Sequence, residues 1–374
     1  MTKKNILLIS RSFYPINSPR SFRATELAVE LAKQGNKVTV LLPGNSKTAD
    51  LENFATKNNL ALEFYQPLVW STFSKTSLLG NLSNKLNRLL FLLFEYPNIE
   101  IFFKLPLYLK KIKKQYDLLI TIAVPHENHW AVAKFQKNKK IAKAWIADCG
   151  DPFMGNKLES IRAPFYFNKL ENNFLKNADF ITVPTSGAIN AYNALYRNKF
   201  RAIPQGFNFD ANEMAEYKTN PNKVIFAYAG GVAPTGIRSL NEFINYLLTK
   251  EEIDFEFHVF SKNINILEQF VAKSKGKIVL HNSIPRSELL FELSKMDFLV
   301  NLDNGMSTAS PSKLIDYKLT KRPILNILPN NINKDLVDEF LNKNYTNQFL
   351  FENIDDYNIV NVANNFLKLG DEVI

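Results

Sequence analysis

The amino-acid sequence predicts an α/β protein made of two doubly wound, Rossmann-like domains. In both halves of the 374-residue chain, short continuous apolar runs typical of buried parallel strands alternate with segments whose apolar residues recur at helical spacing. Between the halves, the polar residues 210–222 are typical of a linker. We therefore expect an N-terminal domain over residues 1–209 and a C-terminal domain over residues 210–374, with a final helix at residues 359–369 that packs back on one of them.

The first β-α-β unit lies at the N-terminus. Apolar runs at Asn5–Ser10 and Lys37–Leu42 predict two buried strands, with an amphipathic helix between them. Ser18 and Pro19 are typical of a helix start, because serine caps free N–H groups and proline has none to satisfy. Arg20 follows in the first turn. Doubly wound sheets bind ligands at such positions, so Ser18 and Arg20 are candidate ligand residues; the alternative is a well-capped helix with a solvated arginine.

Residues 60–114 are basic and aromatic. Within them, Leu86, Leu89 and Phe94 fall on one helical face, beside Lys85 and Arg88. Such a surface can rest on anionic lipid headgroups, and the net charge of +10 favours an anionic partner. The alternative is an ordinary domain helix with its basic residues in water.

The remaining strands of the two sheets are predicted from further apolar runs. They are Asp117–Val124, Lys143–Ala147, Asn177–Val183, Phe200–Pro204, Val224–Tyr228, Phe255–Ser261, Ile278–His281, Asp297–Asp303 and Pro323–Ile327. The loops after the first two contain His129 and Asp151, at the ligand-binding edge of the sheet. The neighbouring His126 and Glu127 would suit a metal together with His129, but no further histidine or cysteine has a fitting local spacing, so we expect no metal.

A second helix start follows the predicted strand Asp297–Asp303. Ser310 is a natural N-cap and Pro311 fits the first helical position, so free N–H groups gather at Ser312 and Lys313. A lysine in a first helical turn is unfavourable by about 0.3–1 kcal/mol unless an anion lies beside it. We therefore expect a bound phosphate here.

A glycine-rich loop follows the strand Val224–Tyr228, at the same edge of the same predicted sheet. Gly230 and Gly231 allow the backbone to approach a ligand closely, and the planar fork of Arg238 can pair with a phosphate. The loop and the start of the second helix together predict a diphosphate site.

Composition excludes several classes of protein. The only cysteine, Cys149, rules out an internal disulfide and favours a reducing cytoplasm. The N-terminal apolar run is too short for a signal peptide, and no segment approaches the roughly 20 apolar residues of a membrane span. We expect a cytoplasmic protein, soluble or peripheral on the membrane face. The charge would suit nucleic acid, but no recognition motif is found.

The order of these motifs resembles the retaining glycosyltransferases of family 4, which have the GT-B fold and occur in bacterial surface-polysaccharide clusters. The resemblance covers most of the chain and is strongest at Asn5–Leu42, Asn177–Gln205 and Val224–Ile327. It implies two Rossmann-like domains facing across a cleft, with the acceptor on the first and the nucleotide-sugar donor on the second. It also implies transfer from a donor such as a UDP-sugar to a saccharide, lipid-linked acceptor in capsule, O-antigen, lipopolysaccharide or exopolysaccharide synthesis, with no cofactor and no metal.

The resemblance assigns roles to particular residues. It places Lys313 and Arg238 on the donor diphosphate, Asp316 on the nucleotide ribose, and the backbone of Ser283 and Ile284 near the base. The first domain would face the donor with Ser18 and Arg20, the transferred sugar with His129, and the reaction centre with Asp151. The other donor-binding positions are Gly230, Gly231, Ser310 and Ser312.

Two departures from the family pattern leave alternatives open. The family has a glutamate that meets the hexose where this chain has Thr308, and an arginine where it has Gly150. A GT-B-like sugar-nucleotide epimerase and a degenerate, non-catalytic nucleotide-binding protein are therefore the rival interpretations. The rival interpretation of His129 is a capped or core histidine, and that of Asp151 and Asp316 is a solvated or capping carboxylate.

Overall fold

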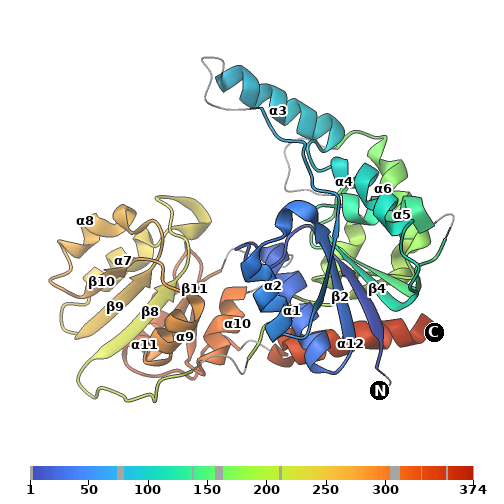
Figure 1. Ribbon diagram of the computed structural model, residues 1–374. Coiled ribbons are helices and arrows are strands. Elements are labelled where there is room, and N and C mark those ends of the chain that lie inside the picture. Colours follow the sequence, from blue (N-terminus) through green and yellow to red (C-terminus); the bar gives the residue numbers. More distant parts are fainter. Residues whose placement is uncertain are drawn as a thin grey trace. The chain divides into compact units, whose positions relative to one another are not determined.

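The computed structural model describes residues 3–73, 80–136, 139–155, 163–209, 213–303, 312–329, 331–350 and 353–373. The chain divides into two compact units (Figure 1). The first unit contains Met1–Asn208 and Asp356–Ile374, and the second contains Phe209–Asp355. In the part of the chain that the structure describes, no helix combines the length and the apolar character that a membrane crossing requires.

The first unit is built on a parallel sheet of seven strands. Their order is β3-β2-β1-β4-β5-β6-β7, so the chain reverses its direction of winding between β1 and β4. The strands are β1 (Asn5–Ile9), β2 (Lys37–Pro43), β3 (Ala61–Tyr65), β4 (Tyr116–Ile122), β5 (Ala142–Asp148), β6 (Phe180–Val183) and β7 (Phe200–Ala202). The loops that follow β1, β4 and β5 meet at one edge of this sheet, as the doubly wound prediction requires.

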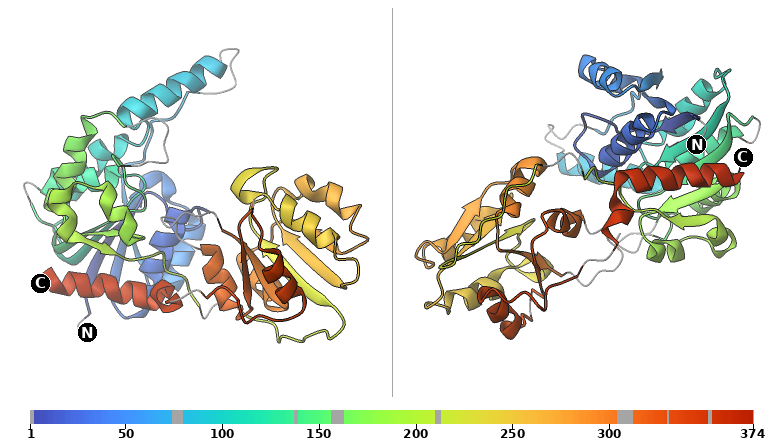
Figure 2. Two further views of the ribbon diagram at one scale, coloured as in Figure 1. Left: turned by 180° about the vertical axis from the view of Figure 1, so that it is seen from behind. Right: turned by 90° about the horizontal axis from the view of Figure 1, so that it is seen from below.

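Helices cover both faces of the first sheet. One face packs against α4 (Glu100–Leu109), α5 (Glu127–Gln136) and α6 (Phe167–Asn177). The other packs against α1 (Pro19–Lys33), α2 (Ala49–Lys57) and α12 (Ile359–Val373). The last helix of the chain therefore belongs to the first unit, where it lies along α1 (Figure 2). Helix α3 (Gly80–Phe94) extends away from the rest of this unit (Figure 1).

The second unit is built on a five-stranded parallel sheet. Its order is β10-β9-β8-β11-β12, and the winding reverses between β8 and β11. The strands are β8 (Val224–Ala229), β9 (Phe255–Phe260), β10 (Ile278–His281), β11 (Phe298–Leu302) and β12 (Ile324–Ile327). One face packs against α7 (Asn241–Leu248), α8 (Glu268–Val271) and α11 (Lys334–Leu341), and the other against α9 (Arg286–Ser294) and α10 (Ser312–Leu319). The prediction of two Rossmann-like sheets is confirmed.

The sequence did not predict two elements, helix α2 and strand β3. Strand β3 is an edge strand whose residues are mostly only partly buried, and its sequence lacks a continuous apolar run. Helix α1 does begin at Pro19 with Ser18 as its N-cap, as predicted. The predicted cap Ser310 and the departure at Thr308 lie outside the described residues.

Candidate functional site

The strongest ligand-binding geometry lies at the switch point of the second sheet. Here the loop after β8 meets helix α10. Tyr317 of α10 is fully buried and fastens the two together: its hydroxyl accepts the N–H of Ala229 at 2.8 Å and donates to the Ala229 carbonyl at 3.3 Å. Lys313 precedes Tyr317 by one helical turn, so both lie on the same face of α10. The anchor therefore holds Lys313 against the glycine loop.

Gly230 and Gly231 leave the space that two cations occupy. A Cβ on Gly230 would lie 2.6 Å from Lys313 Nζ, and a Cβ on Gly231 would lie 3.3 Å from Arg238 Nη1. The absence of side chains at these two positions thus permits Lys313 and Arg238 to approach the same backbone. The predicted association of Gly230, Gly231, Arg238 and Lys313 is present in the structure.

The Lys313 ammonium packs against Tyr228, close to the charge of Arg238. Its ammonium lies 4.3 Å from the centre of the Tyr228 ring and donates to the Tyr228 hydroxyl at 3.3 Å. Burial, together with the positive charge of Arg238, lowers the pKa of Lys313 to about 8. Among the described residues neither cation has a carboxylate partner within ion-pair distance. Two neighbouring cations at the positive end of a helix are suited to an anion such as a phosphate, and the phosphate site stays a prediction.

Asp316 lies on the same helix but has a partner. Arg286 at the start of α9 donates through Nε at 2.9 Å and through Nη2 at 2.6 Å, both to Asp316 Oδ1. Burial raises the pKa of Asp316 and the charge of Arg286 opposes that rise. The ion pair links α9 to α10 on the same helix as Lys313, which is a finding that the sequence did not predict.

The other predicted donor residues lie around this edge of the second sheet. Ile284 follows β10 and packs on the small core that contains Ala229 and Tyr317, while Ser283 is exposed beside it. Ser312 begins the described part of α10.

In the first unit, Arg20 and Asp151 form an ion pair at the ligand edge of the sheet. The Arg20 Nη2 to Asp151 Oδ2 distance is 3.2 Å, and 63% of the Asp151 side chain is exposed. The Arg20 guanidinium lies over Gly150, where a Cβ would come within 1.6 Å of Nη2. Ser18 is occupied as a cap, because its side chain accepts the N–H of Ser21 at 3.3 Å.

A second arginine, Arg23, is buried beside this edge of the sheet and pairs with Asp148 at the end of β5. Arg23 forms a bidentate pair with Asp148, with bonds of 2.9 and 2.7 Å, and Thr182 donates to the same carboxylate at 2.6 Å. The opposing effects of burial and of Arg23 leave the pKa of Asp148 below its ordinary value. Arg23 also donates to the carbonyls of Ile203 and Pro204. The pair therefore ties α1, β5 and β7 together, and its signal in the sequence is only an arginine on the buried face of an amphipathic helix.

His129 does not reach the surface of the first unit. Its ring is completely buried, with Nδ1 2.7 Å from Thr121 Oγ1 and Nε2 3.5 Å from Cys149 Sγ. Burial lowers the pKa of His129 to about 3, so the ring is neutral at pH 7. The predicted contact between His129 and a sugar stays a prediction. His126, in the preceding loop, is also buried, and its Nε2 lies 3.1 Å from the Asp151 carbonyl.

Glu127 is a further buried group at this edge. It begins α5, has no exposed surface, and neither carboxylate oxygen has a hydrogen-bond partner among the described residues. Burial, reinforced by the charge of Glu95, raises the pKa of Glu127 to about 8. The side chain is therefore a neutral acid at pH 7.

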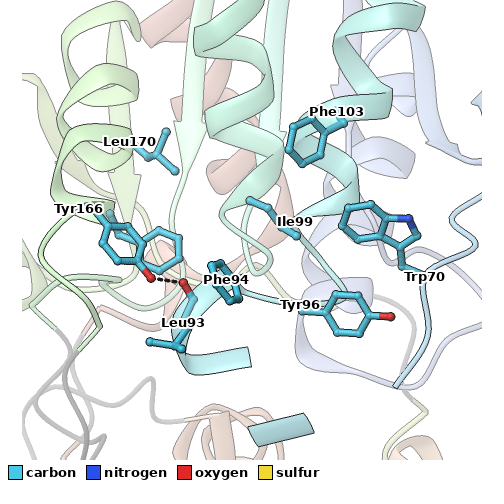
Figure 3. Close-up of a pocket in the computed structure, with 9 residues that line it drawn as sticks. Trp70, Leu93, Phe94, Tyr96, Ile99, Phe103, Tyr166 and Leu170 are labelled. Carbon is cyan, nitrogen blue, oxygen red and sulfur yellow. Dashed lines mark hydrogen bonds between the residues drawn. The ribbon is translucent and has the colours of Figure 1, made fainter. Parts of the chain in front are cut away.

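The described part of the first unit also contains an apolar pocket of about 630 Å³ between the end of α3, α4 and the start of α6 (Figure 3). The hydroxyls of its two tyrosines are bonded to backbone carbonyls, Tyr96 to Ser71 and Tyr166 to Leu93. The pocket thus presents apolar surface. Its lining includes Trp70, Leu93, Phe94, Tyr96, Phe103 and Tyr166.

Comparison with known proteins identifies the fold. No protein-family model matches the chain, and no curated sequence matches it. Among solved structures, a glycosyltransferase from Rickettsia africae is 14% identical with a TM-score of 0.58, covering 100% of this chain and 99% of its own. The lipopolysaccharide outer core galactosyltransferase WaaB is 10% identical with a TM-score of 0.58, covering 99% of both chains. The chain has the GT-B fold.

A UDP-N-acetylglucosamine 2-epimerase has the same fold. It is 12% identical with a TM-score of 0.51, covering 98% of this chain and 95% of its own. The GT-B fold therefore accommodates both sugar transfer and sugar epimerisation, and the choice between them depends on the residues of the site.

Proposed function

We propose that this protein is a retaining glycosyltransferase that moves a sugar from a nucleotide-sugar, a UDP-sugar in our proposal, to a lipid-linked saccharide in bacterial surface-polysaccharide synthesis. The observation that carries the proposal is the pair of cations Lys313 and Arg238 at the switch point of the second sheet, which have no carboxylate partner among the described residues. The fold, the resemblance of the sequence to family 4, and the galactosyltransferase WaaB among the solved structures support sugar transfer.

The proposed role of these cations is to stabilise the negative charge that develops on the leaving diphosphate. Breaking the bond between the sugar and the diphosphate places negative charge on the leaving phosphate, and fixed positive groups at that phosphate lower the barrier. Lys313, Arg238 and the N–H groups at the start of α10 supply such groups. In this proposal they take the role that a divalent metal has in other transferases.

In this proposal the first unit binds the acceptor. Arg20, Asp151 and Ser18 lie at the ligand edge of its sheet, and the exposed Asp151 is suited to contact a saccharide hydroxyl. No substrate contact is assigned to His129, because its ring is enclosed by the core of the first unit.

The apolar features of the first unit support a lipid-linked acceptor. Helix α3 exposes Leu86, Leu89 and Phe94 by 40%, 50% and 53%, with the exposed cations Lys85 and Arg88 beside them. Phe94 also lines the apolar pocket (Figure 3), so the exposed face of α3 continues into that pocket. A cationic and apolar helix binds anionic membrane surfaces, and an adjacent apolar pocket suits a lipid chain. We therefore propose a peripheral position on the cytoplasmic membrane face.

The test is a screen of nucleotide-sugars with and without a lipid extract that contains saccharide acceptors, following release of the nucleoside diphosphate. The proposal expects release that depends on the acceptor. An epimerase, the second candidate because of the epimerase among the structural neighbours, would convert the nucleotide-sugar to its epimer without any acceptor. Nucleotide binding without release across the whole acceptor panel would favour the degenerate, non-catalytic alternative.

A further inference from the structure

Two histidines that are close in the sequence meet a distant cysteine in the core of the first unit. His126 and His129 are on the loop after β4 and the first turns of α5, and Cys149 directly follows β5. One potential ligand atom from each lies within 4.8 Å of those of the other two, and all three residues are buried. We propose that His126, His129 and Cys149 bind a thiophilic metal cation, Zn²⁺ or Cu⁺, at a site separate from the phosphate-binding cations.

The distance between His129 and Cys149 already fits a metal. A cation bound at about 2.0 Å to nitrogen and about 2.3 Å to sulfur is tetrahedral when these two atoms are roughly 3.5 Å apart. The observed separation of His129 Nε2 and Cys149 Sγ is 3.5 Å. The two atoms are therefore as far apart as two ligands of a single tetrahedral cation.

The hydrogen bonds of the two histidines leave the required lone pairs. A carbonyl oxygen only accepts, so His126 Nε2 must carry the proton that it donates to Asp151 at 3.1 Å. His126 Nδ1 then has a lone pair, and this buried atom has no hydrogen-bond partner in the part of the chain that the structure describes. His129 is held on its other side, since Nδ1 lies 2.7 Å from Thr121 Oγ1, which also accepts from Trp145 at 3.0 Å. Metal-binding histidines are typically oriented through the second ring nitrogen in this way.

The surroundings select the class of cation. Aromatic rings enclose the cluster, with Phe153 at 5.3 Å from the His126 ring and Phe174 at 5.1 Å from the His129 ring. One thiolate and two neutral imidazoles suit Zn²⁺ and Cu⁺, whereas Mg²⁺ and Ca²⁺ require oxygen ligands. Binding replaces the proton of the Cys149 thiol, which is released to solvent, and involves no oxidation or reduction. With one thiolate and two neutral imidazoles, a site that holds Cu⁺ is neutral and a site that holds Zn²⁺ has a net charge of +1.

The remaining adjustment concerns His126. Two nitrogen ligands of a tetrahedral metal are about 3.3 Å apart. One nitrogen of His126 lies within 4.8 Å of the ligand atoms of His129 and Cys149, so the His126 ring must shift towards them to complete the site. The bound metal would join the loop after β4 to the loop after β5, and so would hold the backbone of Asp151 through His126.

The experiment measures metal in the untagged full-length protein, purified without chelator under reducing conditions. We expect about one equivalent of zinc or copper per chain. Protein refolded with added Zn²⁺ or Cu⁺ should unfold at a temperature about 5 °C or more above the chelated sample. Replacement by Co²⁺ should give a thiolate-to-metal charge-transfer band. Separate Zn²⁺ and Cu⁺ titrations decide which cation binds more tightly.

Variants locate the site. Cys149→Ser and His126→Phe should each lose the metal and the charge-transfer band. His281→Asn is the control. His281 belongs to the second unit, where its Nε2 lies 2.9 Å from His258 Nδ1. This variant should keep one full equivalent of metal. Metal-free wild-type protein that neither Zn²⁺ nor Cu⁺ stabilises would overturn the proposal, as would an unchanged metal content in Cys149→Ser. The test on metal-free wild-type protein remains decisive even if a variant fails to fold.

Discussion

The guanidinium of Arg20 occupies the space in which a side chain on residue 150 would begin. A Cβ at Gly150 would lie 1.6 Å from Arg20 Nη2, and the same Nη2 pairs with Asp151 at 3.2 Å. Arg20 from α1 therefore takes up the space that any side chain at position 150 would need. This relationship gives a physical reason for a glycine at position 150.

Gly150→Ala should displace Arg20 and separate it from Asp151. We expect activity to fall about tenfold or more, as for a misplaced positioning residue, with little change in the unfolding temperature because the displaced side chain is partly exposed. A double-mutant cycle with Arg20→Ala isolates the cause. In the Arg20→Ala background the alanine at position 150 should have almost no further effect on kcat/KM. A full additional loss in that background would show that the Gly150 backbone, and not Arg20, explains the effect.

The pH dependence of nucleotide binding should report on Lys313. Its pKa in the free protein is lowered to about 8, first by burial and then by Arg238, so the ammonium is charged below that pH and loses its proton above it. A phosphate binds the charged form. Affinity for a nucleoside diphosphate should therefore fall by about tenfold between pH 7 and pH 9.

Calorimetric titration across this range measures the effect. Lys313→Arg is the control, because a guanidinium keeps its charge throughout the range, and its affinity should vary much less with pH. Equal slopes for wild type and Lys313→Arg would contradict the assignment of Lys313 to the phosphate.

The buried pair of Arg23 and Asp148 should be essential for the stability of the first unit. Asp148→Asn leaves the Arg23 guanidinium, whose side chain is only 5% exposed, without its counter-ion. Breaking a buried pair of this kind costs about 3–5 kcal/mol. Chemical denaturation, followed by Trp130 and Trp145 fluorescence in the core of this unit, measures the change. As a matched control, Glu52→Gln removes the carboxylate of an exposed pair with Lys47 and should cost less than about 1 kcal/mol.

Binding to membranes should depend on the cations of α3. Lys85→Glu with Arg88→Glu should weaken binding to vesicles that contain anionic lipid by roughly 2 kcal/mol or more, since each basic residue near such a surface contributes about 1 kcal/mol. Sedimentation with vesicles measures the change. Lys318→Glu with Lys334→Glu makes the same change in net charge on the second unit. If both double variants bind equally well, α3 is not the membrane-binding surface.

The sequence predicted the architecture because the central strands of the two sheets are buried on both faces. Such strands appear as continuous apolar runs, and the runs at Asn5–Ser10 and Asp297–Asp303 lie within one residue of β1 and β11 at each end. Strand β3 lacked this signal because it lies at the edge of the first sheet and is only partly buried. A continuous apolar run in the sequence thus decided which strands could be predicted: the edge strand β10 has one, and β3 does not.

The candidate site was predictable where chemistry is local in the sequence. Lys313 was singled out because a cation in a first helical turn conflicts with the helix dipole, and that conflict does not depend on tertiary contacts. The contacts of Arg23 with Asp148, and of His129 with Cys149, join residues that are 125 and 20 positions apart. Only the fold brings such residues together, so no local spacing revealed them. The burial of His129 was likewise invisible, because it results from the packing of α6 against α5.

The most direct test of the central claim is nucleotide-dependent thermal stabilisation of four proteins. They are wild type, Lys313→Ala, Arg238→Ala and Lys318→Ala, the last removing a lysine from the other end of the same helix. If Lys313 and Arg238 bind the diphosphate, a nucleoside diphosphate should stabilise wild type and Lys318→Ala equally, and the stabilisation should be largely lost in the other two. Undiminished stabilisation of both Lys313→Ala and Arg238→Ala would contradict the proposed donor site.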